Sequence, residues 1–353
     1  MQLNGLQTPA LIVDKKKFEK NMQIMKALVD GSGIALRPHF KSHKSVAIAH
    51  MQIANGAKGM TCAKLSEAED LADAGIDDIL IANQVVEPQK IARLAYLANH
   101  CRLTVCVDND KNIEDLDKAA ALAGSTIYLY IEFEIGMQRC GITDPQEVLR
   151  LAKLIQSKNN LSFAGIQAYA GHISHMVDGK AREELTLHNH VKIRNLLKLL
   201  DENGVPVKEV SGASTGTVHY KVRENLYTEL QTGSYLFMDA VYGQLGLPFE
   251  NSLFILTTVV SKQENITVVD AGVKTCGVDQ GMPSIVGATA QRIVDSEEHF
   301  QLHGLSENVQ VGDKLLLIPG HCCSTVNLHD RIYMIEDDKV VDRIQITARF
   351  CGK

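Results

Sequence analysis

A lysine flanked by histidines is the first feature of this sequence that could do chemistry. Lys41 lies in the segment RPHFKSHK, residues Arg37–Lys44, with a histidine two residues away on each side. A lysine amine held in a protein site is a nucleophile that can attack a carbonyl group. A lone lysine near the end of a strand is more often a solvated surface charge, so this interpretation depends on what lies nearby.

Two segments of small residues could hold an anion. They are Ser211–Thr217, SGASTGT, and Gln231–Tyr235, QTGSY. Small side chains leave backbone N–H groups open to an anion such as a phosphate group. Glycine-rich segments are mostly turns, so either segment alone is a weak signal. Together with Lys41 they predict a site for a phosphate-bearing ligand.

A third cluster combines histidine and cysteine in PGHCCSTVNLHD, residues Pro319–Asp330. If this segment is extended, His321 and Cys323 point to the same side, because residues two apart share a face. An imidazole and a thiolate that converge suit a zinc-like ion. The alternative is a buried thiol beside a structural histidine. His172 and His175 form a further pair, for which a capping or surface role is equally compatible with the sequence.

The elements that must position these residues alternate along the chain. β-rich runs start near Ile34, Gly59, Ile79, Leu103, Ile127, Phe163, Val207 and Leu226. Helices are expected between most of them, most clearly over Lys64–Asp73, Pro145–Ser157 and Arg182–Asn203. This alternation predicts an α/β fold, a (β/α)8 TIM-type barrel, with an open doubly wound sheet as the competing fold. In a barrel, Lys41 and both small-residue segments fall at C-terminal strand ends, where active sites lie.

The pattern changes after about Gly243, where β-rich runs follow one another without a convincing helix. We therefore expect two domains, a barrel over 8–243 and a C-terminal all-β domain over 244–353 that carries His321 and Cys323. The sequence does not decide whether residues 1–7 join the β domain.

Composition excludes several classes of function. The net charge of −6, the absence of Trp and the 5% aromatic content argue against a nucleic-acid-binding face. We see no run of about 20 apolar residues, so no membrane-spanning helix is expected. The 8 cysteines lack a disulfide-like framework, and we see no export signal, so we expect reduced thiols and a cytoplasmic location.

The whole chain resembles the D-threonine aldolase/D-serine dehydratase-like family, a fold type III group of pyridoxal-phosphate (PLP) enzymes related to alanine racemase. The markers are Thr8–Asp14, Arg37–Lys44, Gln138–Ile142, Ala164–Tyr169, Tyr227–Asp239, Asn251–Ser261, Asp270–Thr275 and Pro319–Asp330. The segments TVNLHD and YTELQTGSY look more like the aldolase branch than the dehydratase branch.

The resemblance implies a role for each matching residue. Lys41 matches the lysine that binds PLP as a Schiff base, and the neighbouring cation Arg37 or Lys44 would favour its unprotonated amine. The other positions are Arg139, Gln167 and Tyr169 around the cofactor ring, Ser214, Thr215, Gly216, Gly233 and Ser234 with Tyr235 at the phosphate, His175 near the reacting hydroxyl group, and His321 and Cys323 at a metal. Cys323 departs from the pattern, because aldolases can carry Asp there whereas dehydratases tend to carry Cys.

The resemblance therefore implies a lyase that depends on PLP and on a divalent metal, zinc or manganese. It would cleave small D-3-hydroxy amino acids to glycine and an aldehyde. The alternative is a dehydratase that acts on D-serine or 3-hydroxyaspartate, followed by an amino-acid racemase or a non-catalytic PLP-binding protein. We also expect a homodimer, and the sequence leaves open whether the metal site and PLP come from the same subunit.

Overall fold

The computed structural model describes residues 2–349, which form two compact units. The first, called the barrel unit below, consists of residues 26–41 and 49–233. The second, called the β unit, consists of residues 2–25, 42–48 and 234–349. The boundary that we expect between residues 243 and 244 stays a prediction.

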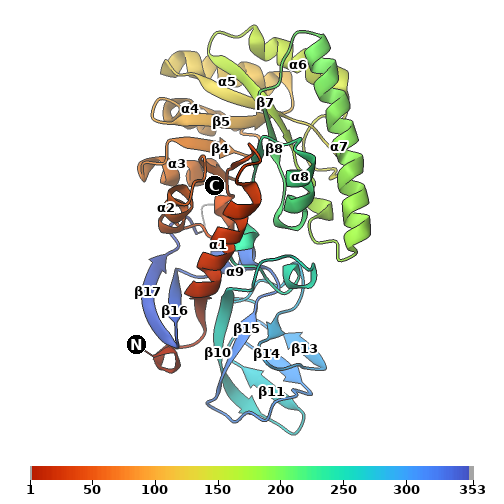
Figure 1. Cartoon of the computed structure of the whole chain (residues 1–353). Helices are drawn as coiled ribbons and strands as arrows, with labels where there is room; N and C mark the ends of the chain where they lie inside the picture. The colour runs from red at the N-terminus through yellow and green to blue at the C-terminus, as the bar shows by residue number, and fades with distance from the viewer. Residues whose placement is uncertain (1, 350–353) are drawn as a thin grey trace. The chain divides into compact units, whose positions relative to one another are not determined.

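The barrel unit is built on a parallel sheet with the strand order β2-β9-β8-β7-β6-β5-β4-β3. Figure 1 labels β4, β5, β7 and β8 of this sheet. Its two end strands also meet. The N–H of Thr61 donates to the carbonyl of Pro38, and the N–H of Lys58 donates to the carbonyl of Leu36, each at 2.8 Å. These contacts close the sheet, so the barrel is confirmed and the open doubly wound sheet is excluded. The strands are β2 (Ala35–Leu36), β3 (Met60–Cys62), β4 (Asp78–Ile81), β5 (Arg102–Val107), β6 (Ile127–Glu132), β7 (Leu161–Ala168), β8 (Glu209–Gly212) and β9 (Glu229–Leu230).

Helices alternate with these strands along the chain, and short polar residues fix where they begin. The side chain of Asp144 accepts a hydrogen bond from the N–H of Gln146 at the start of α6, and Asp178 accepts from two N–H groups at the start of α7. This cap explains why α7 begins three residues before the expected Arg182. The helices are α1 (Lys15–Val29), α2 (Val46–Ala54), α3 (Leu65–Asp73), α4 (Pro88–Leu97), α5 (Asp110–Ala123), α6 (Pro145–Gln156), α7 (Gly179–Glu202) and α8 (Val218–Glu224).

Part of the barrel core comes from neighbouring strands. Leu80, Cys106, Tyr130 and Ala164, from β4, β5, β6 and β7, pack into one buried cluster. Alternate residues on a strand face opposite sides of the sheet, so the flanking Ile79 and Ile81 are buried on the other side. Burial of each such aliphatic side chain stabilises the fold by roughly 1.5–3 kcal/mol.

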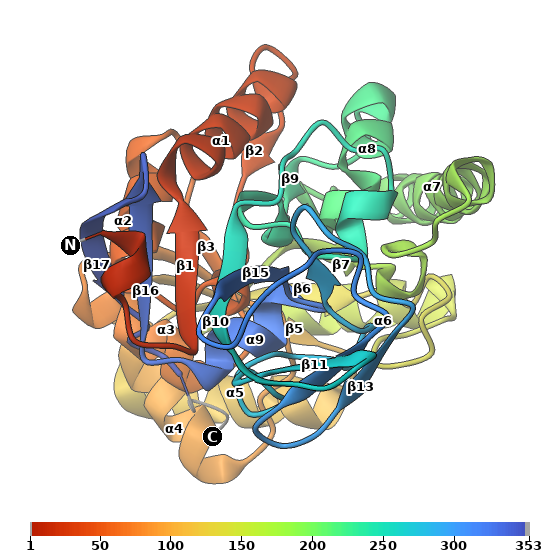
Figure 2. The same cartoon turned by 90° about the horizontal axis from the view of Figure 1, so that it is seen from below.

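The β unit contains a mixed sheet in which β1 (Ala10–Asp14) pairs antiparallel with β10 (Leu253–Lys262) and parallel with β16 (Arg331–Glu336) (Figure 2). This sheet confirms the predicted β domain. One expectation is wrong: a helix, α9 (Cys322–Leu328), lies in this part of the chain. The other strands are β11 (Ile266–Val269), β12 (Ser284–Ile285), β13 (Arg292–Asp295), β14 (Phe300–His303), β15 (Lys314–Ile318) and β17 (Lys339–Gln345).

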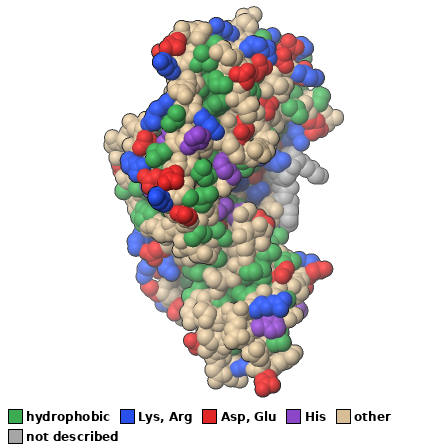
Figure 3. All heavy atoms as spheres, turned by 90° about the vertical axis from the view of Figure 1, so that its right-hand side faces the viewer, with side chains coloured by type: hydrophobic (Ala, Val, Ile, Leu, Met, Phe, Trp, Pro, Cys, Tyr) green, Lys and Arg blue, Asp and Glu red, His purple; other side chains and the backbone are tan. Residues whose placement is uncertain are grey.

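Charged side chains of both signs are interspersed on the face shown in Figure 3. None of the helices within residues 2–349 combines the length and the apolar character that crossing a bilayer requires. The cysteines in this part of the chain, Cys62, Cys101, Cys106, Cys140, Cys276, Cys322 and Cys323, are thiols rather than disulfide partners.

Candidate active site

Lys41 lies in a pocket at the C-terminal ends of the barrel strands. It follows β2 in a short 3-10 helix, Phe40–Ser42, and its backbone N–H donates to Nδ1 of His39 at 3.4 Å. The pocket has a volume of about 210 Å³ and is lined by His39, Lys41, Ala63, Ala82, Asn83, Arg139, Cys140, Gln167, Tyr169 and Gln231. The structure thus brings Lys41 together with all three residues that we expected around a cofactor ring.

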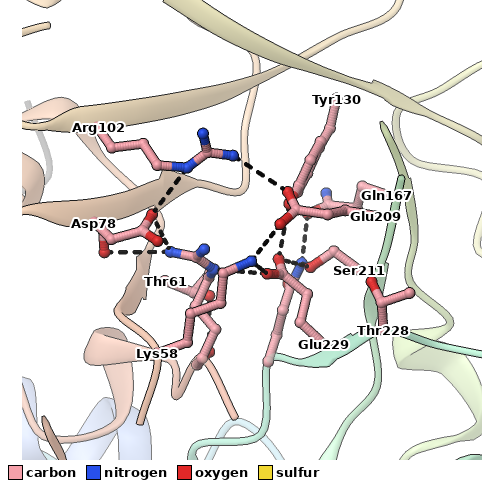
Figure 4. Close-up of polar contacts among 12 residues, drawn as sticks. Lys58, Thr61, Asp78, Arg102, Tyr130, Gln167, Glu209, Ser211, Thr228 and Glu229 are labelled. Carbon is pink, nitrogen blue, oxygen red and sulfur yellow. Dashed lines mark hydrogen bonds and ion pairs between the residues drawn. The ribbon is translucent and has the colours of Figure 1, made fainter. Parts of the chain in front are cut away.

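Two amide side chains join the pocket to the barrel interior. Nε2 of Gln231 donates to Oε1 of Gln167 at 2.9 Å and to Oγ of Ser211 at 2.8 Å. The hydroxyl of Ser211 in turn donates to Glu229 at 2.7 Å (Figure 4). Gln231 is therefore held between Gln167 and Ser211. These hydrogen bonds fix the position of Gln167 in the pocket wall.

Next to these amides lies a layer of ion pairs that is fully buried around Glu229 and partly exposed at Lys58 and Arg102 (Figure 4). The guanidinium of Arg37 contacts Glu229 at 3.0 Å and Asp78 at 2.8 Å. Burial alone would lower the pKa of Arg37, but these carboxylates raise it above its ordinary value. We expected Arg37 or Lys44 to act as a cation beside Lys41. For Arg37 this expectation is wrong, because its charge is neutralised by carboxylates inside the barrel.

Lys58, Arg102 and Tyr130 complete this layer. Lys58 pairs with Glu209 and lies 3.3 Å from Glu229, and Arg102 lies 3.5 Å from Glu209. Burial opposes ionisation of Glu209, but hydrogen bonds from Lys58 and Tyr130 hold the pKa of this carboxyl below its ordinary value. Burial, followed by the two nearby carboxylates, raises the pKa of the Tyr130 phenol far above its usual range, so it acts as a hydrogen-bond donor.

Arg139 is positioned by a carboxylate and an aromatic ring. Its guanidinium lies 5.6 Å from the centre of the Tyr169 ring and 3.7 Å from Oε1 of Glu132. Glu132 is 5% exposed and accepts a hydrogen bond from Gln84 at 2.6 Å. Gly141 has a φ of +102°, and a Cβ there would lie 2.8 Å from the Glu132 carbonyl oxygen. This glycine therefore allows the chain to bring Arg139 back to the pocket.

The loop after β8 fits an anion. Ala213 has a left-handed φ of 79°, and the chain then turns through a 3-10 helix, Thr215–Thr217, with Ser214 before it. The hydroxyls of Ser214 and Thr217 lie 3.1 Å apart. Oγ1 of Thr215 is buried and has no hydrogen-bond partner among residues 2–349. A buried hydroxyl without a partner is unfavourable, and a bound phosphate oxygen would supply an acceptor.

The remaining predicted residues are distributed over both units. Gly233 is buried in the barrel unit, two residues after Gln231. Ser234 and Tyr235 are buried in the β unit, where they begin a 3-10 helix. His175 is partly buried in the barrel unit, after β7, and is not among the residues that line the Lys41 pocket.

His321 and Cys323 lie in contact at the start of α9. We assumed that this segment is extended, and that assumption is wrong. His321 precedes the first helical turn, and Cys323 lies within it. Nδ1 of His321 lies 2.7 Å from Asp279, which also accepts a hydrogen bond from Ser324 at 2.5 Å. Burial alone would lower the pKa of His321, but Cys323 and Asp279 raise it to about 9.

This donor set fits a metal with two protein ligands. Asp279 occupies Nδ1 of His321, which leaves Nε2 as the ligand nitrogen, and such a carboxylate partner is common for metal-bound histidines. Sγ of Cys323 lies 3.5 Å from Oγ of Ser42 and 3.8 Å from Oγ of Ser234. Within residues 2–349 there is no group of three or more His, Cys, Asp or Glu residues placed to hold an ion. Further ligands would have to come from outside these residues.

Sequence reasoning missed six residues of the Lys41 pocket as site residues, namely His39, Asn83, Cys140, Gln231 and the small Ala63 and Ala82. A positional signal was available for two of them. Asn83 follows β4 and Gln231 follows β9 directly, and side chains after parallel strands meet at one end of a barrel. His39 was noticed only as a neighbour of Lys41, and Cys140 only as part of a motif.

Comparison with known proteins identifies the family. Residues 13–241 match the alanine racemase N-terminal domain, and residues 252–335 match a domain described as a putative serine dehydratase domain. The chain is 38% identical to a D-threonine aldolase of Arthrobacter sp, over 98% of this chain and 94% of that protein. It is also 38% identical to a 3-hydroxy-D-aspartate aldolase of Paracoccus denitrificans (strain Pd 1222), over 100% of this chain and 94% of that protein.

Solved structures agree with these matches. The crystal structure of D-threonine aldolase from Filomicrobium marinum superimposes with a TM-score of 0.96 at 36% identity, covering 100% of this chain and 98% of that one. The D-threo-3-hydroxyaspartate dehydratase from Delftia sp. HT23 superimposes with a TM-score of 0.89 at 25% identity, covering 98% of each chain. With Lys41 at the barrel mouth and both domains matched in order, the chain belongs to the alanine racemase N-terminal domain family, in its D-threonine aldolase/D-serine dehydratase-like group.

Proposed function

We propose that this protein is a PLP-dependent lyase that cleaves D-3-hydroxy amino acids to glycine and an aldehyde. The observation that carries the proposal is the pocket in which Lys41 meets Arg139, Gln167 and Tyr169. Two relatives at 38% identity over nearly the whole chain are named as aldolases that act on D-threonine and on 3-hydroxy-D-aspartate. The relative named as a D-threo-3-hydroxyaspartate dehydratase is 26% identical.

The residues of the barrel unit fit the cofactor. Lys41 would supply the amine that binds PLP covalently, with Arg139 and Tyr169 beside the ring and Gln167 held by Gln231. The phosphate group would lie on the loop that contains Thr215, whose buried hydroxyl has no partner among the described residues. Bound PLP withdraws electrons from the bonds at Cα of an amino acid. The other proposed phosphate contacts are Ser214, Gly216, Gly233, Ser234 and Tyr235.

A divalent metal held by His321 and Cys323 is part of the proposal. The metal supplies positive charge that favours loss of a proton from a hydroxyl group. A thiolate and an imidazole favour zinc, and manganese is the second candidate. Solved structures of the related dehydratase include a cysteine-to-alanine mutant in the metal-free form and a histidine-to-alanine mutant at a position two residues away, which matches the spacing here. We assign to His175 the role of accepting the proton of the substrate's β-hydroxyl group.

A dehydratase is the second candidate, and one observation favours it. Position 323 is Cys, which we associate with dehydratases rather than aldolases. The same active-site residues would then assist loss of the β-hydroxyl group, and the products would be a 2-oxo acid and ammonia.

We further propose that the protein is a cytoplasmic homodimer. A strictly monomeric active enzyme in sedimentation would overturn the dimer.

Product analysis tests the proposed function directly. Purified protein with PLP and Zn²⁺ or Mn²⁺ is given D-threonine, D-serine or D-3-hydroxyaspartate, with L-threonine as the stereochemical control. We expect glycine and an aldehyde from D-threonine and no product from L-threonine. Ammonia and a 2-oxo acid would establish the dehydratase instead. The Lys41→Ala variant is the matched control and should form neither set of products.

A further inference from the structure

The predicted phosphate site contains no charged side chain. Its members are Ser214, Thr215, Gly216, Gly233, Ser234 and Tyr235. A phosphate monoester carries a charge of about −1.5 to −2 near pH 7. Hydroxyl and backbone N–H groups can hold such an anion, but a nearby cation lowers the free energy of the buried charge further.

One buried lysine of the barrel unit has no counter-ion among the described residues. Lys221 on α8 is 1% exposed, and its Nζ has no hydrogen-bond partner among residues 2–349. The ammonium lies 3.8 Å from the centre of the Tyr227 ring. Leaving a lysine fully buried without a carboxylate partner is unfavourable, and proteins rarely do so without a reason.

The contacts of Tyr227 place this amine beside the phosphate loop. Its hydroxyl donates to the carbonyl of Ala168 at the end of β7, at 2.9 Å. Its ring lies so close to Gly212, at the end of β8, that a Cβ there would be 2.7 Å from Cε1. The chain runs from Gly212 directly into Ala213 and the phosphate loop. Lys221 therefore lies next to the strand end from which that loop begins.

Helix geometry directs the side chain the same way. Lys221 follows Thr217 by four residues, which is about one helical turn. Side chains on a helix lean toward its N-terminus, so the lysine stem runs back toward Thr217 and the loop. Thr215 in the same loop also carries a buried polar atom without a hydrogen-bond partner among the described residues, its hydroxyl oxygen. Two neighbouring segments thus each hold a buried group that an anion would satisfy.

We propose that Lys221 is a positioning residue for the cofactor, whose ammonium supports the phosphate group from behind the Ala213–Thr217 loop. This inference rests on the proposed PLP function and adds a residue to it. Lys221 is expected to raise the affinity for phosphorylated ligands and to have little influence on the covalent chemistry at Lys41.

The titratable neighbours agree with this role. Burial lowers the pKa of Lys221 to about 7, so the amine is easily neutral until an anion is bound. His190 from α7 is fully buried with both ring nitrogens unpartnered among the described residues, and burial and then Lys221 lower its pKa to about 4. Tyr227 remains a neutral phenol because burial raises its pKa. Neither neighbour competes with a phosphate group for the lysine proton.

The test compares PLP with pyridoxal, which has the same aldehyde but no phosphate group. Binding to the apo protein is followed by absorbance for the wild type and for Lys221→Met, which keeps the length of the stem. We expect PLP to bind about 10- to 100-fold more weakly to the variant, as for loss of one charge-assisted contact. Pyridoxal should bind both proteins equally. Lys192→Met, at an exposed lysine of α7, is the control and should change neither constant.

Each outcome has a separate meaning. Equal PLP affinity in wild type and Lys221→Met would overturn the role of Lys221, and so would a parallel loss for PLP and pyridoxal, which would indicate a structural effect. If the wild type does not bind PLP at all, the proposed function fails instead. Lys221→Gln serves as the second neutral variant if Lys221→Met does not fold, and the same two constants decide.

Discussion

The contact between Glu229 and Arg37 permits a quantitative test of how the barrel supports its pocket. Glu229 is fully buried and accepts hydrogen bonds from Arg37 at 3.0 Å, Tyr130 at 3.1 Å and Ser211 at 2.7 Å. Replacement of Glu229 by Gln keeps the shape of the side chain and removes its charge. Among the described residues, the guanidinium of Arg37 then retains only Asp78 as a carboxylate partner.

The magnitude follows from burial. Arg37 is 0% exposed, so water cannot replace the lost carboxylate. Breaking a buried ion pair by removing one partner destabilises a protein by about 3–5 kcal/mol. Arg37→Met should have an effect in the same range, because within residues 2–349 it leaves Glu229 with Lys58 as its only cationic partner. The double variant removes both charges, so it should lose less than the sum of the singles by about 2 kcal/mol.

Urea unfolding of the four proteins measures this coupling. The free energy of unfolding is obtained from the midpoint and slope of each transition, followed by two spectroscopic probes. Glu297→Gln is the control, because its ion pair with Lys274 is exposed and its loss should have no measurable effect. If the two single effects add to within about 0.5 kcal/mol in the double variant, Arg37 and Glu229 do not interact and our account of the layer is refuted.

Three further predictions concern pH, metal and cofactor. His190 has a folded-state pKa of about 4 against about 6.5 when unfolded, so its contribution to stability should be complete above pH 6.5 and be lost as the pH falls toward 4. The loss of stability should reach about 1.4 kcal/mol at pH 5.5, and His190→Phe should reduce this acid sensitivity in urea unfolding. Chelation should abolish turnover but leave the PLP absorbance intact, and normal turnover by Cys323→Ala would make that site structural. Borohydride should fix PLP on Lys41, and a label on Lys64 or Lys274 would contradict the assignment.

The barrel could be predicted because its signals are local. Strands of apolar residues alternate with amphipathic helices, and caps such as Asp144 and Asp178 mark where helices begin. The pocket followed from topology, because residues at the ends of parallel strands meet at one mouth of a barrel. Topology placed Lys41 at this mouth, whereas Gln167 and Tyr169 were assigned to the same site by the resemblance, and both line the Lys41 pocket.

Long-range pairing could not be predicted from the chain alone. Arg37 was expected to act on Lys41, four residues away, but its partners are Asp78 and Glu229, at 41 and 192 residues' separation. No local pattern indicates which carboxylate closes onto a given arginine. The same limit applies to α9, where the short run CCSTVNL contains two cysteines and a Thr-Val pair that suggest a strand, yet a helix forms. His321 and Cys323 do meet, although the geometry that we assumed for them was wrong.

The charged layer of the barrel explains why few residues determine the electrostatics of its pocket. Arg37, Lys58 and Arg102 face Asp78, Glu209 and Glu229, so the charges of this layer balance one another. The neutral amides of Gln231 and Gln167 line the pocket, and Gln231 connects to the layer through Ser211. Such a balanced layer helps to fix the positions of the amides, but it produces little net electric field in the pocket, since opposite charges at short separation cancel at a distance. The electrostatics of the pocket are then set by its own residues, Lys41, Arg139 and the nearby Glu132. Substitutions in the layer should therefore change stability before they change the chemistry at Lys41.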